Sequence, residues 1–245
     1  MPEIGFDERL RIYGRSVMLS NHTMSDIVDN ATPEQKEYLM KVLEEELSFR
    51  EANRKRRLLK KANFPSPKSF AGYEWSSVRM PTGLTREDLV ACEFVKDARN
   101  LVLYGPVGTG KTHMCIALGT AACGMGLKVR YFTTTELVSL LSSAKEAGTV
   151  GKLMKQLGQS DMVILDEFGY VPVDRDGARL LFQVISESYE QRSLVITTNV
   201  DFSHWGAVLT DDQMAAAIID RIAHHGHLLV FEGESYRLKH ALMRA

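Results

Sequence analysis

The feature that most limits what this chain can fold into is the segment Gly-Pro-Val-Gly-Thr-Gly-Lys-Thr at positions 105–112. It fits the pattern G-x-x-x-x-G-K-[ST] at every fixed position. It lies between a short apolar run, residues 100–104, and a helix-like stretch that begins at His113. Such a loop works between a strand and a helix N-terminus, where backbone N–H groups and the helix dipole face phosphate oxygens. The sequence therefore predicts an α/β domain that binds a nucleoside triphosphate.

The motif also assigns roles to its two terminal residues. Lys111 is expected to reach the β- and γ-phosphates, and the Thr112 hydroxyl is expected to ligate Mg²⁺. The predicted nucleotide-binding residues of this segment are Gly105, Pro106, Val107, Gly108, Thr109, Gly110, Lys111, Thr112 and His113.

The rest of the C-terminal part alternates between strand-like and helix-like segments. Strands are expected at residues 100–104, 128–133, 162–165, 193–198 and 228–231. Helices are expected at residues 112–124, 136–147, 151–157, 176–191 and 212–223. This alternation predicts right-handed crossovers and a five-stranded parallel sheet with both faces covered.

The N-terminal part is different in character. Residues 1–64 contain no strand-like alternation, and Thr32-Pro33 is a good start for a long helix that runs to about Asn63. We expect a small all-helical N-terminal domain over residues 1–64, a connector over 65–99 and the nucleotide-binding domain over 100–245.

Composition excludes two settings for the chain. No apolar stretch approaches the roughly 20 residues that span a bilayer, and the first residues lack the profile of a secretion signal. Three cysteines without C-x-x-C spacing fit a reducing compartment. The sequence therefore predicts a cytoplasmic protein that does not enter a membrane.

Two carboxylates directly follow the apolar run 162–165. Ligands of parallel sheets bind at the carboxyl ends of the strands, so Asp166 is expected to bind Mg²⁺ and Glu167 to polarise an attacking water. Asn199 follows another apolar run, and we expect its amide near the γ-phosphate. The simpler alternatives are a solvated acidic turn for the carboxylates and a cap residue for Asn199.

Arg221 follows Asp220 at the end of a predicted helix. Its guanidinium is either a surface charge of its own subunit or a group that stabilises the spread charge at a neighbouring subunit's γ-phosphate. The pattern alone favours neither.

The order of these motifs resembles that of the AAA+ ATPases, and more closely the IstB-like branch beside the DnaC-type helicase loaders. The resemblance covers roughly residues 35–240. The matching segments are Gly105–Thr112, Asp166–Tyr170, Thr197–Asn199, Asp220–His225 and Gly233–Arg237, with Asn53–Arg57 and Ala62–Pro65 upstream. Phe168 and Val107 depart from the branch, where Leu and Pro are more frequent, without changing a chemical group.

IstB-like proteins are the ATP-dependent helper subunits of an insertion-sequence family, which assemble on target DNA, deform it and recruit the partner transposase. The resemblance therefore implies ATP and Mg²⁺ as cofactors, ATP hydrolysis at interfaces of a homo-oligomer, and a cognate transposase as partner. It makes Arg221 an arginine finger that acts across the interface and Arg237 a second arginine near the nucleotide. About fifteen residues follow the last expected strand in this sequence, so we expect an AAA+ core without a C-terminal helical lid.

Two alternative functions would use the same phosphate loop. A DnaC-type loader would bind a replicative helicase through its N-terminal region. A small-molecule phosphotransferase would need an acceptor pocket and a mobile lid, and neither is evident in the sequence.

Double-stranded DNA is the expected nucleic-acid partner, bound without sequence specificity. Six of the eight residues from Arg54 to Lys61 are basic. In initiator-type AAA+ proteins, the region between the second and third strands carries an extra helix that faces nucleic acid. The predicted DNA contacts are Arg50, Arg54, Arg56, Arg57, Lys60, Lys61, Lys145, Lys152 and Lys155. A solvated charge run, partly balanced by residues 44–46, is the alternative.

Overall fold

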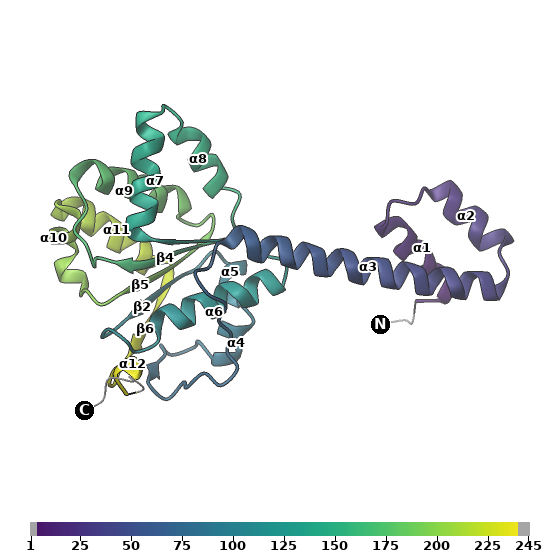
Figure 1. The fold of residues 1–245 in the computed structure, drawn as a ribbon, viewed down its shortest axis with the longest axis horizontal. Helices are drawn as coiled ribbons and strands as arrows, with labels where there is room; N and C mark the ends of the chain where they lie inside the picture. The colour runs from purple at the N-terminus through teal and green to yellow at the C-terminus, as the bar shows by residue number, and fades with distance from the viewer. Residues whose placement is uncertain (1–3, 240–245) are drawn as a thin grey trace. The chain divides into compact units, whose positions relative to one another are not determined.

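The computed structural model describes residues 4–239. Internal contacts divide the chain into two compact units, Met1–Arg57 and Leu58–Ala245. Each unit has its own buried apolar core, and each is described by itself (Figure 1).

The first unit is helical, as predicted. It consists of α1 (Phe6–Ser16), α2 (Asn21–Asn30) and most of α3 (Pro33–Ala62). Helix α3 begins with a capping box, in which the Thr32 N–H donates to the Gln35 side chain at 2.9 Å and the Gln35 N–H donates to the Thr32 hydroxyl at 3.4 Å. The four buried core residues come from all three helices: Leu10, Met24, Met40 and Leu43.

The second unit is built on a sheet of six strands, not the five that the sequence predicted. In chain order they are β1 (Val78–Arg79), β2 (Asn100–Tyr104), β3 (Val129–Thr133), β4 (Met162–Phe168), β5 (Ser193–Thr198) and β6 (Gly226–Phe231). Their order across the sheet is β1-β6-β2-β5-β4-β3. Strands β2 to β6 are parallel, whereas β1 pairs antiparallel with β6. The sheet is therefore mixed, and the additional strand is too short to show an alternating pattern.

Both faces of the sheet are covered. Along β2, Leu101 and Leu103 pack on one side and Val102 on the other, as a period of two requires. The first side carries α4 (Arg86–Val90), α5 (Glu93–Lys96) and α6 (Lys111–Gly124). The opposite side carries α7 (Thr134–Glu146), α8 (Val150–Leu157), α9 (Arg175–Ser188), α10 (Trp205–Leu209) and α11 (Asp212–His224) (Figure 1). A short 3-10 helix, η1 (Phe202–His204), precedes α10.

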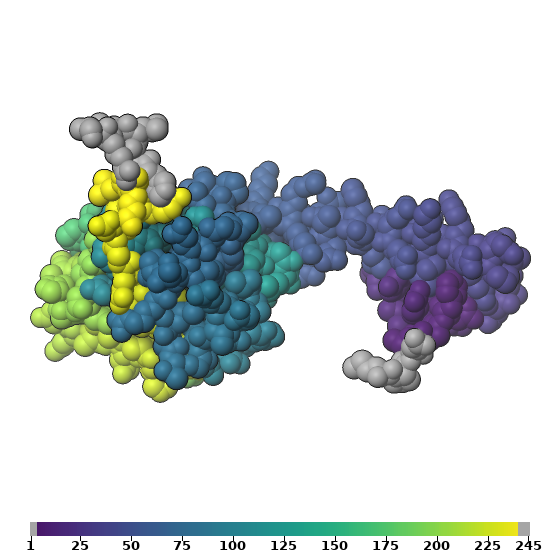
Figure 2. Space-filling model, turned by 90° about the horizontal axis from the view of Figure 1, so that it is seen from below, coloured from purple at the N-terminus to yellow at the C-terminus, as the bar shows by residue number. Residues whose placement is uncertain are grey.

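Residues 65–99 pack against this core. Leu89 and Phe94 are buried in the layer that contains α6, and the Glu232 N–H donates to the Ser77 carbonyl at 2.8 Å. The end of α3 joins the same layer through Leu58 and Ala62. Figure 2 shows the yellow C-terminal segment on the surface beside this blue part of the chain.

After β6 the described chain contains one further short helix, α12 (Tyr236–Lys239). The expected absence of a helical lid concerns residues beyond it and stays a prediction. None of the helices within residues 4–239 combines the length and apolar character that crossing a bilayer requires.

Candidate active site

The phosphate-binding segment forms the predicted turn between β2 and α6. Gly105, Gly108 and Gly110 have φ values of 152°, 84° and 98°, which residues with a side chain rarely adopt. A Cβ on Gly105 would also lie 2.3 Å from the Phe231 carbonyl oxygen, and one on Gly108 would lie 2.0 Å from the Ser235 hydroxyl. The glycines are therefore required by the backbone conformation and by close packing, and helix α6 begins directly after Gly110.

The Lys111 side chain is folded into this loop. Its Nζ donates to the carbonyl oxygens of Gly105 and Pro106, at 2.7 Å in each case, and only 4% of the residue is exposed. The pKa of Lys111 is lowered to about 8, mainly by burial; the attraction of Asp166 opposes this shift, and nearby Arg237 adds to it. The ammonium group thus lies where the loop is shaped to hold phosphate oxygens.

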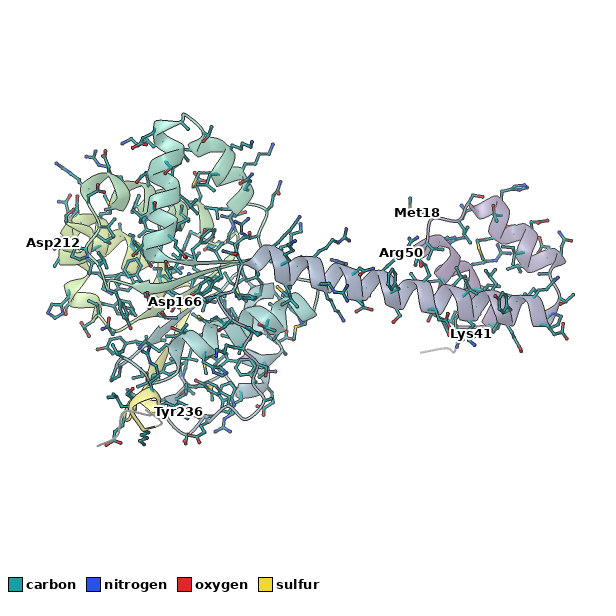
Figure 3. The ribbon with its side chains drawn as sticks, in the orientation of Figure 1. Met18, Lys41, Arg50, Asp166, Asp212 and Tyr236 are labelled. Carbon is teal, nitrogen blue, oxygen red and sulfur yellow. The ribbon has the colours of Figure 1, made fainter. Side chains whose placement is uncertain are left out.

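Asp166 lies at the end of β4, inside the larger unit (Figure 3). One of its carboxylate oxygens accepts a hydrogen bond from the Thr112 hydroxyl at 3.1 Å, and only 1% of the residue is exposed. Hydroxyl and carboxylate oxygens are ligands that Mg²⁺ prefers. When phosphate oxygens of a nucleotide also ligate the ion, Mg²⁺ takes few ligands from the protein. Thr112 and Asp166 are therefore residues that would hold a Mg²⁺ ion.

Glu167, next to Asp166, is exposed and has a φ of 60°. Its backbone N–H donates to the Thr197 hydroxyl at 2.9 Å and to an Asp166 oxygen at 3.2 Å. The two neighbouring carboxylates therefore differ in environment: one is buried and hydrogen-bonded, and the other is open to solvent.

Asn199 directly follows β5, which lies between β2 and β4 in the sheet. In the strand registers, Thr198 pairs with Tyr104 on one side and with Phe168 on the other. The strand ends that carry the phosphate loop, the carboxylates and Asn199 thus meet at one edge of the sheet, as the sequence predicted. Asn199 is exposed at this edge.

The C-terminal segment reaches the phosphate loop. The Tyr236 N–H donates to the Gly108 carbonyl oxygen at 3.0 Å. Arg237 follows in α12 and is close enough to Lys111 to act on its pKa. The structure therefore places Arg237 beside the loop, where the resemblance expects a second arginine.

Arg221 is held by its own subunit. Its guanidinium donates to the Ala217 carbonyl oxygen at 2.8 Å and lies over the Phe182 ring, 5.3 Å from the centroid. None of its hydrogen bonds or ion pairs with residues 4–239 involves the phosphate loop.

The basic residues predicted to contact DNA are exposed on α3, α7 and α8. Two of them already have acidic partners in the chain: Arg50 lies 2.6 Å from Glu46, and Lys145 lies 2.8 Å from Asp176 on α9. Lys152 and Lys155 lie on the exposed part of α8. Arg50 and Lys145 are therefore paired to carboxylates of their own chain, whereas Lys152 and Lys155 are placed on an exposed surface.

Two groups of residues contribute to the site although the sequence assigned them no role. Tyr131, whose hydroxyl donates to Asp166 at 2.7 Å, and Thr197 are buried in strands. Burial, and then the neighbouring Asp166, raise the pKa of Tyr131.

The other group is aromatic. In the sequence it is visible as three aromatic residues within six positions. Phe70, Tyr73 and Trp75 pack together beside the loop, and the Tyr73 ring lies 5.2 Å from that of His113. His113 is anchored to the same segment, because its Nε2 lies 2.9 Å from the Ser69 carbonyl oxygen.

Comparison with known proteins agrees with this geometry. A family model described as IstB-like ATP binding protein matches residues 15–244. The chain is 34% identical over 226 residues to the protein described as the ATP-binding protein of insertion sequence IS21 from Pseudomonas aeruginosa, covering 90% of this chain and 84% of that one. It is 32% identical over 203 residues to the IS5376 counterpart of Geobacillus stearothermophilus, covering 83% and 81%.

Solved structures show the same fold. The DnaI structure aligns with a TM-score of 0.54 at 18% identity, covering 74% of this chain and 93% of that one. The DnaC helicase loader aligns with a TM-score of 0.53 at 20% identity, covering 67% and 96%. At such identities the likeness shows the α/β AAA+ P-loop fold alone. The family model spans nearly the whole chain, and so the chain belongs to the IstB-like family of ATP-binding proteins.

Proposed function

We propose that this chain is an ATP-dependent transposition helper. In this proposal, copies of the chain assemble on duplex DNA with ATP between them, deform the DNA and recruit the partner transposase. ATP hydrolysis then releases or remodels the assembly. The observation that carries the proposal is the contact between Thr112 and Asp166 beside the exposed Glu167, in a chain of the IstB-like family.

The site supports binding of ATP with Mg²⁺. Loop N–H groups, Lys111 and the start of α6 would hold the phosphates, and Thr112 and Asp166 would hold the ion. The bound ion would neutralise charge that develops on the phosphates. The Tyr73 and His113 rings lie next to each other at the N-terminus of α6.

Hydrolysis needs a group that orients water. Glu167 is suited to this task because it is exposed beside the buried Asp166, and Asn199 belongs to the neighbouring strand end. We assign Arg221 to the neighbouring copy's ATP, where a guanidinium stabilises spread charge. In its contacts with Phe182 and Ala217 the Arg221 side chain stays partly exposed, so another subunit could reach it.

The DNA contacts are assigned to the basic residues of α3 and α8. Exposed lysine and arginine side chains bind phosphates through charge, without reading bases.

A replicative helicase loader is the second candidate, favoured by the similarity of fold to DnaC and DnaI. Membership of the insertion-sequence family favours the transposition helper.

One experiment separates the two candidates. The protein is immobilised with ATP and duplex DNA and offered, in turn, its cognate transposase and the replicative helicase of the same cell. The proposal expects ATP-dependent retention of the transposase. Retention of the helicase with none of the transposase would contradict it. A matched column of Lys111→Ala protein controls for retention that does not depend on ATP.

A further inference from the structure

A threonine to which the sequence assigned no role of its own connects the two carboxylates of the site. The Thr197 hydroxyl donates to an Asp166 oxygen and accepts from the Glu167 N–H at 2.9 Å. Thr197 lies on β5, a different strand from both partners, and only 1% of it is exposed. We propose that Thr197 is a positioning residue of the ATPase centre, which fixes the metal-binding carboxylate and the backbone of the catalytic glutamate with one hydroxyl group.

The chemistry of the hydroxyl suits this position. A threonine hydroxyl can donate one hydrogen bond and accept others, and Thr197 uses it in both directions. Glu167 adopts a positive φ, which is uncommon for a residue other than glycine and persists where the surroundings fix it. The hydrogen bond from its N–H to Thr197 is one such fixed point, and it sets the direction in which the Glu167 side chain leaves β4.

Tyr131 completes the arrangement from the opposite side. Its hydroxyl donates to the second oxygen of Asp166 at 2.7 Å, and its ring is packed edge-to-face against Phe64, with centroids 6.0 Å apart. Thr197 and Tyr131 thus hold one carboxylate oxygen each. The Thr112 hydroxyl donates to the same Asp166 oxygen that Thr197 holds.

The chain contains a matched control for Thr197. Thr198 is the next residue on the same strand and is equally buried, at 1% exposure. Its hydroxyl also both donates and accepts: it donates to the Phe168 carbonyl oxygen at 2.7 Å and accepts from the Val200 N–H at 3.0 Å. It makes no hydrogen bond to Asp166 or Glu167 within residues 4–239, so Thr198→Val removes a comparable buried hydroxyl without touching either carboxylate.

The experiment compares Thr197→Val, Thr197→Ser, Thr198→Val and Tyr131→Phe with the parent protein. Affinity for a fluorescent ATP analogue is measured with Mg²⁺ and with EDTA, and steady-state ATP turnover is measured over a Mg²⁺ titration. Thr197→Val is expected to keep the affinity measured in EDTA. It is expected to lose about 10- to 100-fold in turnover and to need more Mg²⁺ for half-maximal binding, as is typical when a partner of a metal ligand is removed. Thr197→Ser should restore both quantities, and Thr198→Val should match the parent.

Parental turnover and parental Mg²⁺ dependence in Thr197→Val would overturn the inference, and so would an equal loss in Thr198→Val. If Thr197→Val does not fold, the same decision rests on Tyr131→Phe, for which we expect the same increase in the Mg²⁺ requirement. The inference rests on the proposed function, but the two fail differently. A parent protein without ATP turnover contradicts the proposed function, whereas the Mg²⁺ dependence of analogue binding still decides the role of Thr197.

Discussion

The Thr112 hydroxyl on α6 lies 3.1 Å from a carboxylate oxygen of Asp166 on β4, although 54 positions separate them in the chain. This contact joins the phosphate loop to the carboxylate edge of the sheet and creates the oxygen pair that fits Mg²⁺. Thr112→Ala should therefore reduce affinity for Mg²⁺–ATP to the value measured in EDTA, whereas Thr112→Ser should keep it. Titration calorimetry with and without Mg²⁺ checks this, and equal affinities for Thr112→Ala and the parent in Mg²⁺ would refute the assignment.

Lys111→Ala should abolish ATP binding. The Nζ group donates to two carbonyl oxygens of the loop, and its removal takes away the ammonium group that would contact the phosphates there. The change is measured with the fluorescent analogue. Lys239→Ala, which removes a lysine of α12 that is paired to Glu234, serves as the control. Binding by Lys111→Ala within a few fold of the parent would contradict the phosphate-site geometry.

Glu167→Gln should bind ATP normally and hydrolyse it at least about 100-fold more slowly, because general-base contributions are typically of this order. The amide keeps the size of the side chain but cannot take a proton from water. Single-turnover assays with radiolabelled ATP separate chemistry from binding. A parental rate in this variant would show that another group activates the water.

Arg221→Ala alone should be inactive in ATP hydrolysis, and so should Glu167→Gln alone. A mixture of the two should regain activity, because an interface between them can combine an intact Glu167 with an intact Arg221. Arg79→Ala removes an exposed arginine that is paired to Glu232 and controls for loss of surface charge. A mixture that stays inactive, although mixed oligomers form, would place Arg221 outside the neighbour's site.

DNA binding should depend steeply on salt. About six neutralised phosphates per protomer give a log–log slope near −5, and each lost contact reduces its magnitude by about 0.9. Lys152→Ala and Lys155→Ala should each reduce the slope, whereas Lys145→Ala should change it less because Asp176 already partners that side chain. Fluorescence anisotropy on duplexes of unrelated sequence checks both the slope and the absence of sequence preference. Unchanged slopes in the α8 variants would exclude this helix from the DNA contact.

The sequence was sufficient for the parts of the site that depend on local order. The phosphate loop follows a strand and opens a helix, and Asp166 ends an apolar run, so both could be located without knowledge of distant contacts. The alternation of segments predicts an α/β fold with a largely parallel sheet, and the family resemblance implies the AAA+ core. The structural comparisons confirm the α/β AAA+ P-loop fold.

Features that depend on pairing between distant segments could not be predicted. Strand β1 has only two residues, and it is a strand because β6, some 150 positions later, lies beside it. Tyr131 and Thr197 have the pattern of ordinary strand residues. Their role appears only when the registers of β3, β4 and β5 bring both hydroxyls to Asp166.

The most direct test of ATP-bridged assembly on DNA is the mass of the complexes in solution. Mass photometry of Glu167→Gln protein with a duplex, Mg²⁺ and ATP should show multimers on the DNA, which disappear when ATP is omitted or Lys111→Ala protein is used. Single protomers in every one of these mixtures, duplex included, would contradict the account.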